Sequence, residues 1–455
     1  MRNVPRDGAS VTEAQKILEL NAFDMKAKGS LPAETEDLIL RRRATFGPTS
    51  MLFYKRPLHV VRAEDVWLYE ADGTRCLDAY NNVPSIGHCH PAVTDAVARQ
   101  IGILNIHTRY LHDGVYAYAE RLLATMPGEI SNIVFTCTGS ESADLAIRIA
   151  RSVTGRTGLI ATENAYHGNT LTVTQVSPSS GSTEPPVDNV VFIPAPDTYR
   201  GGPDNLGPRF AADVRTAIST LKARGIAPAA FIADTIFSSD GIFPGDSGFL
   251  AEAVATIRNA GGLFIADEVQ PGFGRTGEAM WGFMRHGVVP DIVIMGKPMA
   301  NGFPMGGVAI KPDLLGSFGS QNGYFNTFGG NPVAAAAGLA VLDSITSEGL
   351  QQNAHDTGTY LRNELAALTE KHPIIGDVRG AGLYIGVEFV HDAQSREPDR
   401  GVAERIVNAM RERNVLIGTA GKFGNILKIR PPLVFRRQHA DIFLEAFAAS
   451  LKDFV

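Results

Sequence analysis

The chain has 455 residues, 44% hydrophobic and 20% charged, the composition of an ordinary soluble globular protein that is long enough for a large domain plus a smaller one. Its formal charge of 42 − 48 = −6 excludes a general electrostatic attraction to nucleic acid or to an anionic membrane surface. The three scattered cysteines exclude a disulfide framework and a zinc cluster. The N-terminus has no signal-type apolar segment, and the lack of ~18 consecutive apolar residues excludes a membrane span. We therefore expect a cytoplasmic protein without a bound metal.

The first part of the chain is predicted to be helical and then to form short strands. Residues 11–28 place apolar side chains at helical spacing, and a second helix is predicted over 34–43. Residues 58–80 are typical of short strands around a turn. We therefore predict an N-terminal helical arm over 1–44 and the first segment of a small domain over 45–80.

From about residue 132 onwards, apolar bursts alternate with amphipathic segments. The predicted strands are Ile133–Thr136, Gly158–Ala161, Val190–Ile193, Ala229–Ala233, Leu263–Ala266, Ile292–Met295 and Val308–Ile310. Helical patterns lie between several of them, at 141–152, 209–223 and 247–260. This alternation predicts an α/β fold with a mostly parallel central sheet and helices on both faces, in a large domain over residues 81–335.

The chain changes character beyond Pro332. An alanine-rich helix and a long helix over 353–371 come first, and strands then mix with helices. The predicted elements are strands near Leu383–Phe389, Val415–Ile417 and Leu427–Ile429 and helices near 402–413 and 437–452. The mixture predicts an α+β small domain over residues 336–455.

The segment Gly272–Gly277 matches the G-x-G-x-x-G pattern of dinucleotide-binding proteins, and Asp291 follows 19 positions after Gly272. In that fingerprint the acidic residue ends a second strand, and the last glycine opens a helix. Here Asp291 precedes a predicted strand, and Gly282 interrupts the segment that follows Gly277. We expect a loop; a nicotinamide-dependent dehydrogenase is the alternative, which a visible absorbance spectrum tests.

Two predicted strands end in ionisable side chains. The apolar run Leu263–Ala266 ends in Asp267, and the run Ile292–Met295 is followed, after one glycine, by Lys297. Open α/β sheets bind ligands at the carboxyl ends of their strands. A desolvated lysine near a carboxylate that can pair with a ring nitrogen is the arrangement that pyridoxal phosphate chemistry requires. Taken singly, either residue is also compatible with a strand-end side chain in water.

Two loops near the same edge can complete such a site. Gly139 and Ser140 lie between a predicted strand and a helix, where backbone N–H groups and the helix dipole form an anion site suited to a cofactor phosphate. A plain helix cap has the same appearance. Tyr166 follows another predicted strand, and its ring is suited either to stacking on a planar cofactor or to a place in the core.

Five segments, in the same order, resemble the class III (subgroup II) aminotransferases, pyridoxal phosphate enzymes of fold type I. The segments are Thr138–Glu141, Ala165–Gly168, Leu263–Arg275, Pro290–Lys297 and Asn326–Pro332, and the resemblance extends from about Thr45 to the end of the chain. It implies a cofactor, pyridoxal 5'-phosphate, bound by the large domain.

By that resemblance, Lys297 condenses with the cofactor aldehyde, and Asp267 pairs with the pyridine nitrogen. The other contacts that it implies are Val269 behind the ring, Gln270 at the phenolic oxygen, Tyr166 on the front face, and Gly139 and Ser140 at the phosphate. Thr327 would contact the phosphate of the neighbouring subunit's cofactor, because sites of this family form across a homodimer interface. Pairing of dimers into tetramers stays open.

The chain departs from the family at a position that commonly holds a substrate carboxylate. Where an arginine is expected on a late strand, this chain has Lys428, and Arg430 follows two residues later, nominally on the same strand face. Lysine binds phosphate well as a point charge but lacks the bidentate grip of arginine on a carboxylate. The departure argues against ordinary amino-acid transamination.

Other segments resemble the phospho-lyase branch of the family, which acts on phosphoethanolamine or phosphohydroxylysine. They are Asn81–Val83, Gly87–Pro91, Thr108–Asp113, Pro196–Gly201 and Met295–Met299. We predict a phospho-lyase that converts phosphoethanolamine to acetaldehyde, ammonia and phosphate, with Lys428, Arg430 and Asn82 at the substrate phosphate. The alternatives are an ω-aminotransferase that passes an amine to pyruvate or glyoxylate, and a non-catalytic binding protein on the same fold.

Overall fold

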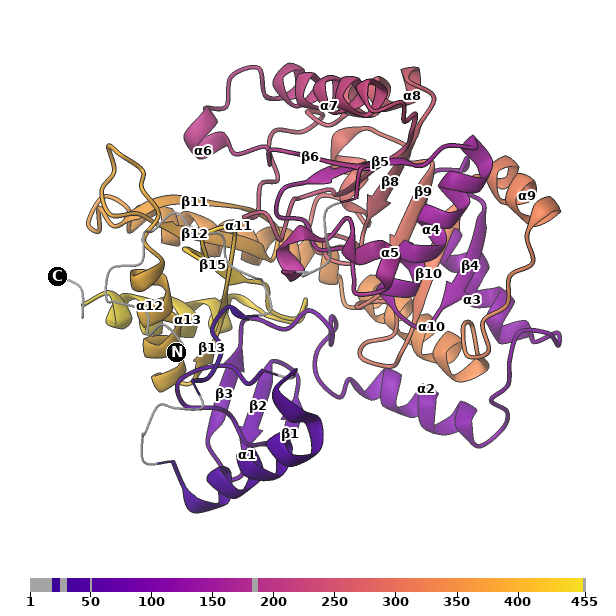
Figure 1. Ribbon diagram of the computed structural model, residues 1–455. Helices are drawn as coiled ribbons and strands as arrows, with labels where there is room; N and C mark the ends of the chain where they lie inside the picture. The colour runs from indigo at the N-terminus through magenta and orange to yellow at the C-terminus, as the bar shows by residue number, and fades with distance from the viewer. Residues whose placement is uncertain (1–18, 25–30, 50, 182–186, 453–455) are drawn as a thin grey trace.

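A seven-stranded sheet forms the centre of the larger part of the molecule (Figure 1). The computed structural model describes residues 19–24, 31–49, 51–181 and 187–452. The sheet order is β4 (Asn132–Thr136), β10 (Gly306–Ile310), β9 (Ile292–Met295), β8 (Leu263–Asp267), β7 (Pro228–Asp234), β5 (Gly158–Thr162) and β6 (Val190–Ile193). Strand β10 runs antiparallel to both neighbours, and all other pairs are parallel. The prediction of a mostly parallel sheet is confirmed, with every predicted strand in it.

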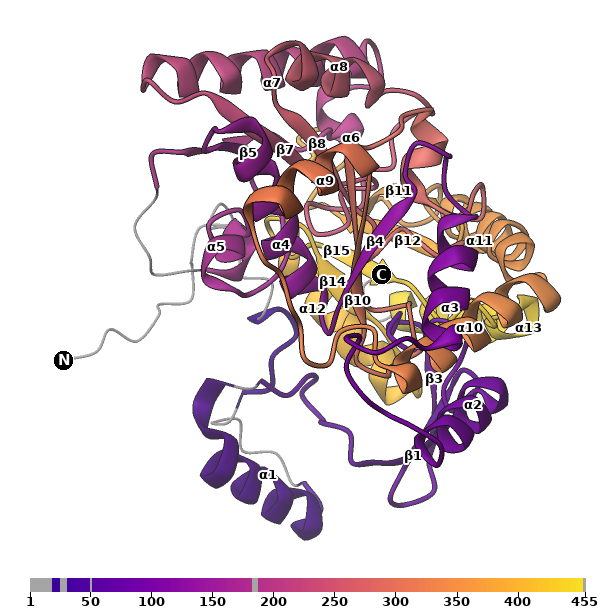
Figure 2. The same ribbon diagram turned by 90° about the vertical axis from the view of Figure 1, so that its right-hand side faces the viewer.

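Helices cover both faces of this sheet, as predicted. Along β7, Phe231 packs in one cluster with residues of α7, and the next residue, Ile232, packs in another cluster with residues of α4. Helices α7 (Leu206–Ala223) and α8 (Ala251–Asn259) lie side by side on the first face (Figure 1 and Figure 2), and α4 (Gly139–Thr154) covers the second. Because both faces are buried, the strands read as continuous apolar runs.

Further helices flank the large sheet. They are α2 (Pro91–Ile101), α3 (Asp113–Leu123), α5 (Leu171–Thr174), α6 (Thr198–Gly201), α9 (Pro312–Gln321) and α10 (Pro332–Ser347). Within the described residues, no single helix is long and apolar enough to cross a membrane; α10 and α11 (Leu350–Ala367) meet that criterion only together, with a bend of 60° between them. The cytoplasmic location stays a prediction.

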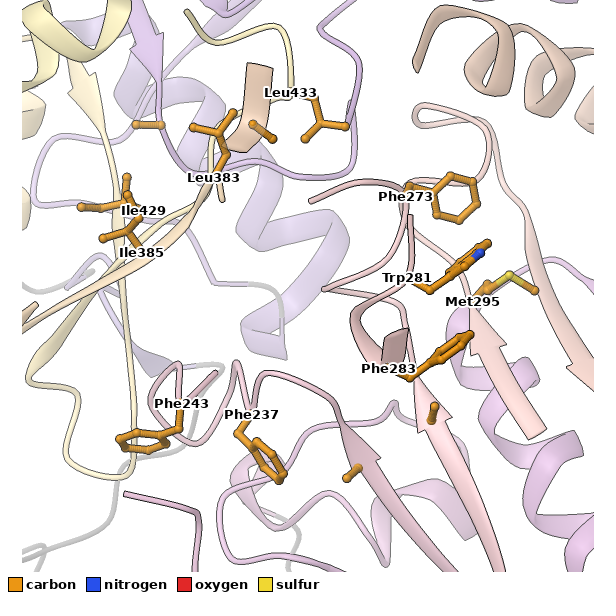
Figure 3. Packing of buried hydrophobic residues seen from close by; sticks show 14 of the residues in the cluster. Phe237, Phe243, Phe273, Trp281, Phe283, Met295, Leu383, Ile385, Ile429 and Leu433 are labelled. Carbon is orange, nitrogen blue, oxygen red and sulfur yellow. The ribbon is translucent and has the colours of Figure 1, made fainter. Parts of the chain in front are cut away.

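The G-x-G-x-x-G segment is a loop next to an aromatic cluster. Trp281 lies between Phe273 and Phe283, with ring centroids 5.0 Å and 6.5 Å away, and all three rings are buried (Figure 3). Asp291 forms an ion pair with Lys311 at 2.6 Å, which gives its carboxylate a structural role. The prediction of a loop is confirmed.

Two four-stranded sheets form the smaller part of the molecule. The first contains β1 (Val60–Glu64), β2 (Trp67–Glu70), β3 (Arg75–Asp78) and β13 (Val415–Leu416), and the second contains β11 (Ile375–Ala381), β12 (Tyr384–Phe389), β15 (Ile426–Ile429) and β14 (Gly418–Ala420). The other helices of this part are α1 (Ala33–Phe46), α11, α12 (Arg400–Glu412) and α13 (Arg437–Leu451). Because β13 pairs with β3, strands from distant parts of the chain share one sheet. The predicted domain boundaries stay predictions.

A buried ion cluster fixes the second small sheet against the rest of the molecule. Glu388 of β12 pairs with Arg379 of β11 at 2.7 Å and with Arg200 of α6 at 2.6 Å. Arg379 also donates to the backbone oxygen of Gly241, which follows β7, at 2.8 Å. Burial alone raises the pKa of Glu388, but the two arginines outweigh burial and lower it. The cluster therefore holds the sheet that carries Lys428 beside the large sheet.

The structure corrects the sequence predictions in two places. The helix predicted over 11–28 is wrong for residues 19–24, which form a turn and an isolated bridge; the rest of that helix lies outside the described residues. Strand β11 is missing from the prediction because Asp377 and Arg379 interrupt its apolar pattern. Their charges pair with each other at 2.7 Å, so the strand tolerates them.

Candidate active site

The carboxylate of Asp267 lies at the carboxyl end of β8 and is 3% exposed. His167 Nδ1 lies 2.7 Å from its Oδ2, and the backbone N–H of Val269 donates to its Oδ1 at 3.0 Å. The neighbouring strand β7 ends in Asp234, which pairs in register with Asp267. Because both oxygens of Asp267 have partners, the carboxylate is fixed in place, where it can stabilise a cationic nitrogen at this edge of the sheet.

Lys297 follows β9 at the same edge and is partly exposed to the pocket that it lines. Its pKa is lowered to about 8, mainly by desolvation and next by the charge of Arg430. Asp267 and Asp234 act in the opposite direction. The lowered pKa gives Lys297 a substantial fraction of neutral amine near neutral pH, and the neutral amine is the nucleophile.

Helix α4 begins at Gly139, beside the Lys297 loop. Its N-cap is Thr138, whose side-chain oxygen accepts from the backbone N–H of Glu141 at 3.1 Å. The two loops approach so closely that a Cβ on Gly296 would lie 3.1 Å from the Cα of Gly139. The cap satisfies one N–H of the first turn, and those of Gly139 and Ser140 have no acceptor within the helix. The helix start can therefore bind an anion next to the lysine.

One pocket joins these elements. It is lined by Gly139, Ser140, Tyr166, His167, Gly168, Asp267, Val269, Gln270 and Lys297. Except for Thr327, every cofactor residue implied by the resemblance lines this pocket. An amine, a fixed carboxylate, a half-buried phenol ring and a helix N-terminus match the aldehyde, the pyridine nitrogen, the planar ring and the phosphate of pyridoxal 5'-phosphate. The residues present fit this cofactor.

Thr327 lies outside that pocket. It is exposed in the loop between α9 and α10. Its neighbour Asn326 lines a different pocket, of about 250 Å³, together with Tyr324 and Phe325. A contact from Thr327 to a cofactor phosphate therefore requires a second subunit, and this role stays a prediction.

Two of the residues predicted to hold a substrate phosphate converge on Gln270. Its Oε1 accepts from Asn82 Nδ2 at 2.6 Å and from Arg430 Nη1 at 2.6 Å. Arg430 also donates from Nε to the backbone oxygen of Tyr80 at 2.8 Å, and its guanidinium lies 4.8 Å from the centre of the Tyr80 ring. Gln270 thereby connects Asn82 and Arg430 to the cofactor pocket.

The third predicted phosphate ligand, Lys428, is buried on β15. Its pKa lies well below its ordinary value because of burial first and then the repulsion of Arg430 and Lys297, while Asp234 acts in the opposite direction. Among the described residues, no carboxylate forms an ion pair with Lys428 or Arg430. Buried cations without an acid partner are costly, so a site that retains them is suited to an anionic ligand.

Sequence reasoning assigned no role to His167 or Asp234. Asp234 directly follows the predicted strand Ala229–Ala233, so the strand-end argument used for Asp267 applies to it equally. Burial, and next the neighbouring Asp267, raises the pKa of Asp234 to about 6. His167 reaches Asp267 across 100 positions of sequence, and no local pattern predicts that pairing.

The model of the aminotransferase class-III family matches residues 53–451. An alanine–glyoxylate aminotransferase 2-like protein of Drosophila melanogaster is 40% identical, over 92% of this chain and 87% of its own. Ethanolamine-phosphate phospho-lyase homolog 1 of Caenorhabditis elegans is 37% identical, over 89% of this chain and 91% of its own. A solved structure of a phospholyase from Arthrobacter in complex with phosphoethanolamine is 43% identical, with a TM-score of 0.88, over 91% of this chain and 99% of that one. With its pocket fitted to a phosphorylated pyridine aldehyde, this chain belongs to the class III aminotransferases, a family of pyridoxal phosphate-dependent enzymes of fold type I.

Proposed function

We propose that this protein is a phospho-lyase, which eliminates phosphate from phosphoethanolamine to give acetaldehyde, ammonia and inorganic phosphate. The observation that carries the proposal is the pair of buried basic side chains, Lys428 and Arg430, which have no acid partner among the described residues. Phosphoethanolamine has a primary amine at one end and a phosphate at the other. It therefore matches a site with the Lys297 amine at one end and two cations at the other.

In this proposal the chain binds its cofactor through the residues of the pocket. Lys297 would hold the aldehyde group, and Asp267 would keep the pyridine nitrogen protonated because opposite charges favour each other's ionised forms. Tyr166 and Val269 would hold the ring, Gln270 its phenolic oxygen, and Gly139 and Ser140 its phosphate. When bound, the cofactor withdraws electrons from the carbon next to the substrate nitrogen and makes that carbon acidic.

With the substrate amine bound, the free amine of Lys297 would accept a proton from the carbon that bears the nitrogen. A pKa of about 8 suits a base that works near neutral pH. Lys428, Arg430 and Asn82 hold the phosphate on the adjacent carbon. Because this phosphate is a good leaving group, its departure outpaces the reprotonation that transamination requires, and no keto acid is consumed.

An ω-aminotransferase is the second candidate, supported by the 40% identity with the relative named alanine–glyoxylate aminotransferase 2-like. The Arthrobacter structure, which is named a phospholyase and contains phosphoethanolamine, supports the lyase. The lysine at position 428 also favours the lyase, since lysine lacks the bidentate grip that an α-carboxylate receives from arginine. Phosphohydroxylysine is the bulkier substrate to test beside phosphoethanolamine.

The proposal includes a homodimer with shared active sites. The surface around the loop of Thr327 is apolar and unusually exposed. Its large hydrophobic side chains, 37–89% exposed, are Leu104, Tyr110, Leu111, Tyr116, Tyr324, Phe325 and Phe328. Exposed apolar patches of this kind mark interaction surfaces, and a second copy of the chain is the occupant that brings Thr327 to a cofactor. Light scattering of the purified protein measures the mass of the assembly.

A phosphate-release assay tests the function. The purified holoenzyme is expected to release inorganic phosphate from phosphoethanolamine without an added keto acid. Lys428→Ala should lower kcat/KM by about 10–100-fold, since a hydrogen bond to a charged group contributes about 1.5–3 kcal/mol, and should leave cofactor affinity unchanged. Lys422→Ala, in the exposed loop between β14 and β15, is the matched control. Phosphate release that requires pyruvate, with alanine formed in equal amount, identifies an aminotransferase instead.

A further inference from the structure

The phosphate that leaves in the proposed reaction needs a proton. A phosphate monoester has its second pKa at about 6, so the bound substrate is a dianion at neutral pH. When the C–O bond breaks, its electron pair goes to an oxygen of a group that is already doubly charged. The trianion that would result is a strong base, and a group that protonates that oxygen as the bond breaks stabilises the departing product.

Lys428 of β15 has a glycine opposite it on each neighbouring strand. It pairs in register with Gly386 of β12 on one side and with Gly418 of β14 on the other, so neither neighbouring strand places a side chain beside it. A Cβ on Gly418 would lie 2.4 Å from the ring of Tyr80, the ring on which Arg430 rests. The Tyr80 ring therefore lies on the face of the sheet that carries both Lys428 and Arg430.

Three charged groups from three strands act electrostatically on Lys428. They are Arg430 on its own strand, Lys297 after β9 and Asp234 at the end of β7. The last two lie at the carboxyl edge of the large sheet, where the proposed reaction takes place. Arg430, two residues further along the same strand, donates to Gln270 of the cofactor pocket, so Lys428 lies close to the site of the proposed reaction.

The other groups near the substrate phosphate are unsuited to proton donation. Two N–H groups of Arg430 donate to Tyr80 and Gln270, and a guanidinium keeps its proton at any working pH. The amide of Asn82 is not an acid, and its Nδ2 already donates to Gln270. Lys297 is engaged at the carbon from which it takes a proton. Of the residues predicted to hold the substrate phosphate, Lys428 is the acid that remains.

We propose that Lys428 protonates the departing phosphate, a role that rests on the proposed phospho-lyase function. As the C–O bond breaks, its electron pair goes to the bridging oxygen, and a proton moves from Lys428 Nζ to that oxygen. The products of this step are hydrogen phosphate dianion and a neutral Lys428 amine, while the proton taken from carbon stays on Lys297. Lys428 regains its proton from solvent when the next substrate dianion binds.

The electrostatics around Lys428 support this cycle. Burial and the two neighbouring cations hold the pKa of Lys428 well below its ordinary value. An ammonium with a lowered pKa transfers its proton readily to a strong base such as a departing phosphate. A bound dianion counteracts the repulsion from Arg430 and Lys297, so substrate binding restores the proton.

A change of leaving group tests the proposal in the holoenzyme. Phosphate release from phosphoethanolamine is compared with chloride release from 2-chloroethylamine, because chloride is a weak base that departs without a proton. Lys428→Arg keeps the positive charge but does not release a proton. The ratio of kcat for phosphate release to kcat for chloride release is expected to fall at least about 100-fold in this variant, as for the loss of a general acid. Lys422→Arg is expected to leave the ratio at its wild-type value.

A binding measurement gives a second readout, independent of turnover. Inorganic phosphate is titrated into the holoenzyme by calorimetry in two buffers of different ionisation enthalpy, at a pH where the ligand is a dianion. The wild type is expected to take up protons on binding, and Lys428→Arg to take up fewer. If Lys428→Arg retains both the wild-type ratio and the wild-type proton uptake, Lys428 is only a phosphate ligand, and the proposal is wrong. If the wild type releases chloride but no phosphate, the phospho-lyase function itself is wrong.

Discussion

The two ends of the active site differ in how their charges are compensated. At the cofactor end, both oxygens of Asp267 have partners, His167 and the backbone of Val269. At the end proposed to bind the substrate phosphate, Lys428 and Arg430 have no acid partner among the described residues. A fixed, compensated carboxylate is preorganised for a group that stays bound, whereas buried basic side chains without an acid partner favour an anion that arrives and leaves. In the proposed function, this difference separates the cofactor from the substrate.

The largest effect is expected from Lys297, which serves both ends. Lys297→Ala removes the amine that condenses with the aldehyde and the base that acts on the substrate, so phosphate release should fall by about 10⁴-fold or more. Borohydride reduction of the wild type should place the cofactor label on the tryptic peptide that contains Lys297. Lys222→Ala, an exposed lysine on α7, is the control. A label on any other peptide contradicts the assignment.

Asp267 tests the cofactor end alone. Asp267→Asn removes the charge that stabilises a protonated pyridine nitrogen, and kcat for phosphate release should fall by about 10²–10³-fold. KM for phosphoethanolamine should change little, because Lys428 and Arg430 stay in place. His167→Gln should have a smaller effect in the same direction, since it loosens the carboxylate without removing its charge. A larger change in KM than in kcat would mean that the two ends are not separable.

The fold was predictable where burial is symmetric. The runs Leu263–Phe264–Ile265–Ala266 and Ile292–Met295 are apolar throughout because both faces of the large sheet are covered, and strand ends at its carboxyl edge then locate Asp267 and Lys297. Strand β11 was not predictable by the same rule. Its Asp377 and Arg379 pair with each other, and Arg379 also pairs with Glu388 of β12, a partner about which a local window of sequence contains no information.

The site was predictable only where its residues follow from local sequence. Residues on one loop or one strand end, such as Gly139 and Tyr166, follow from local pattern and from family resemblance, and they line one pocket. The pairing of His167 with Asp267 and the convergence of Asn82 and Arg430 on Gln270 depend on contacts between distant segments. The burial of Lys428 also does not follow from the sequence. A lysine between the apolar residues Leu427 and Ile429 is typical of a strand that buries one face and exposes the other, with the lysine in solvent.

A pH dependence tests the state of Lys297, the residue that serves both ends. The pKa of Lys297 is lowered to about 8, so in protein freed of cofactor the reactive neutral amine forms as the pH rises through that value. The rate of cofactor uptake should increase about tenfold per pH unit below that pKa and become constant above it. Stopped-flow absorbance measures this rate. A rate that continues to rise towards the ordinary lysine pKa contradicts the lowered value.

The smallest effect is expected at Thr327, which tests whether the cofactor end is complete within one subunit. Thr327→Ala removes one hydrogen bond to the cofactor phosphate, which contributes about 0.5–1.5 kcal/mol, so cofactor affinity should weaken by only about two- to tenfold. A mixed dimer of Thr327→Ala and Lys297→Ala subunits separates the two possibilities. Its one functional Lys297 belongs to the Thr327→Ala subunit, and the threonine offered to that site comes from the other. Affinity at that site should therefore return to the wild-type value, whereas a threonine that acted within its own subunit would leave it weakened.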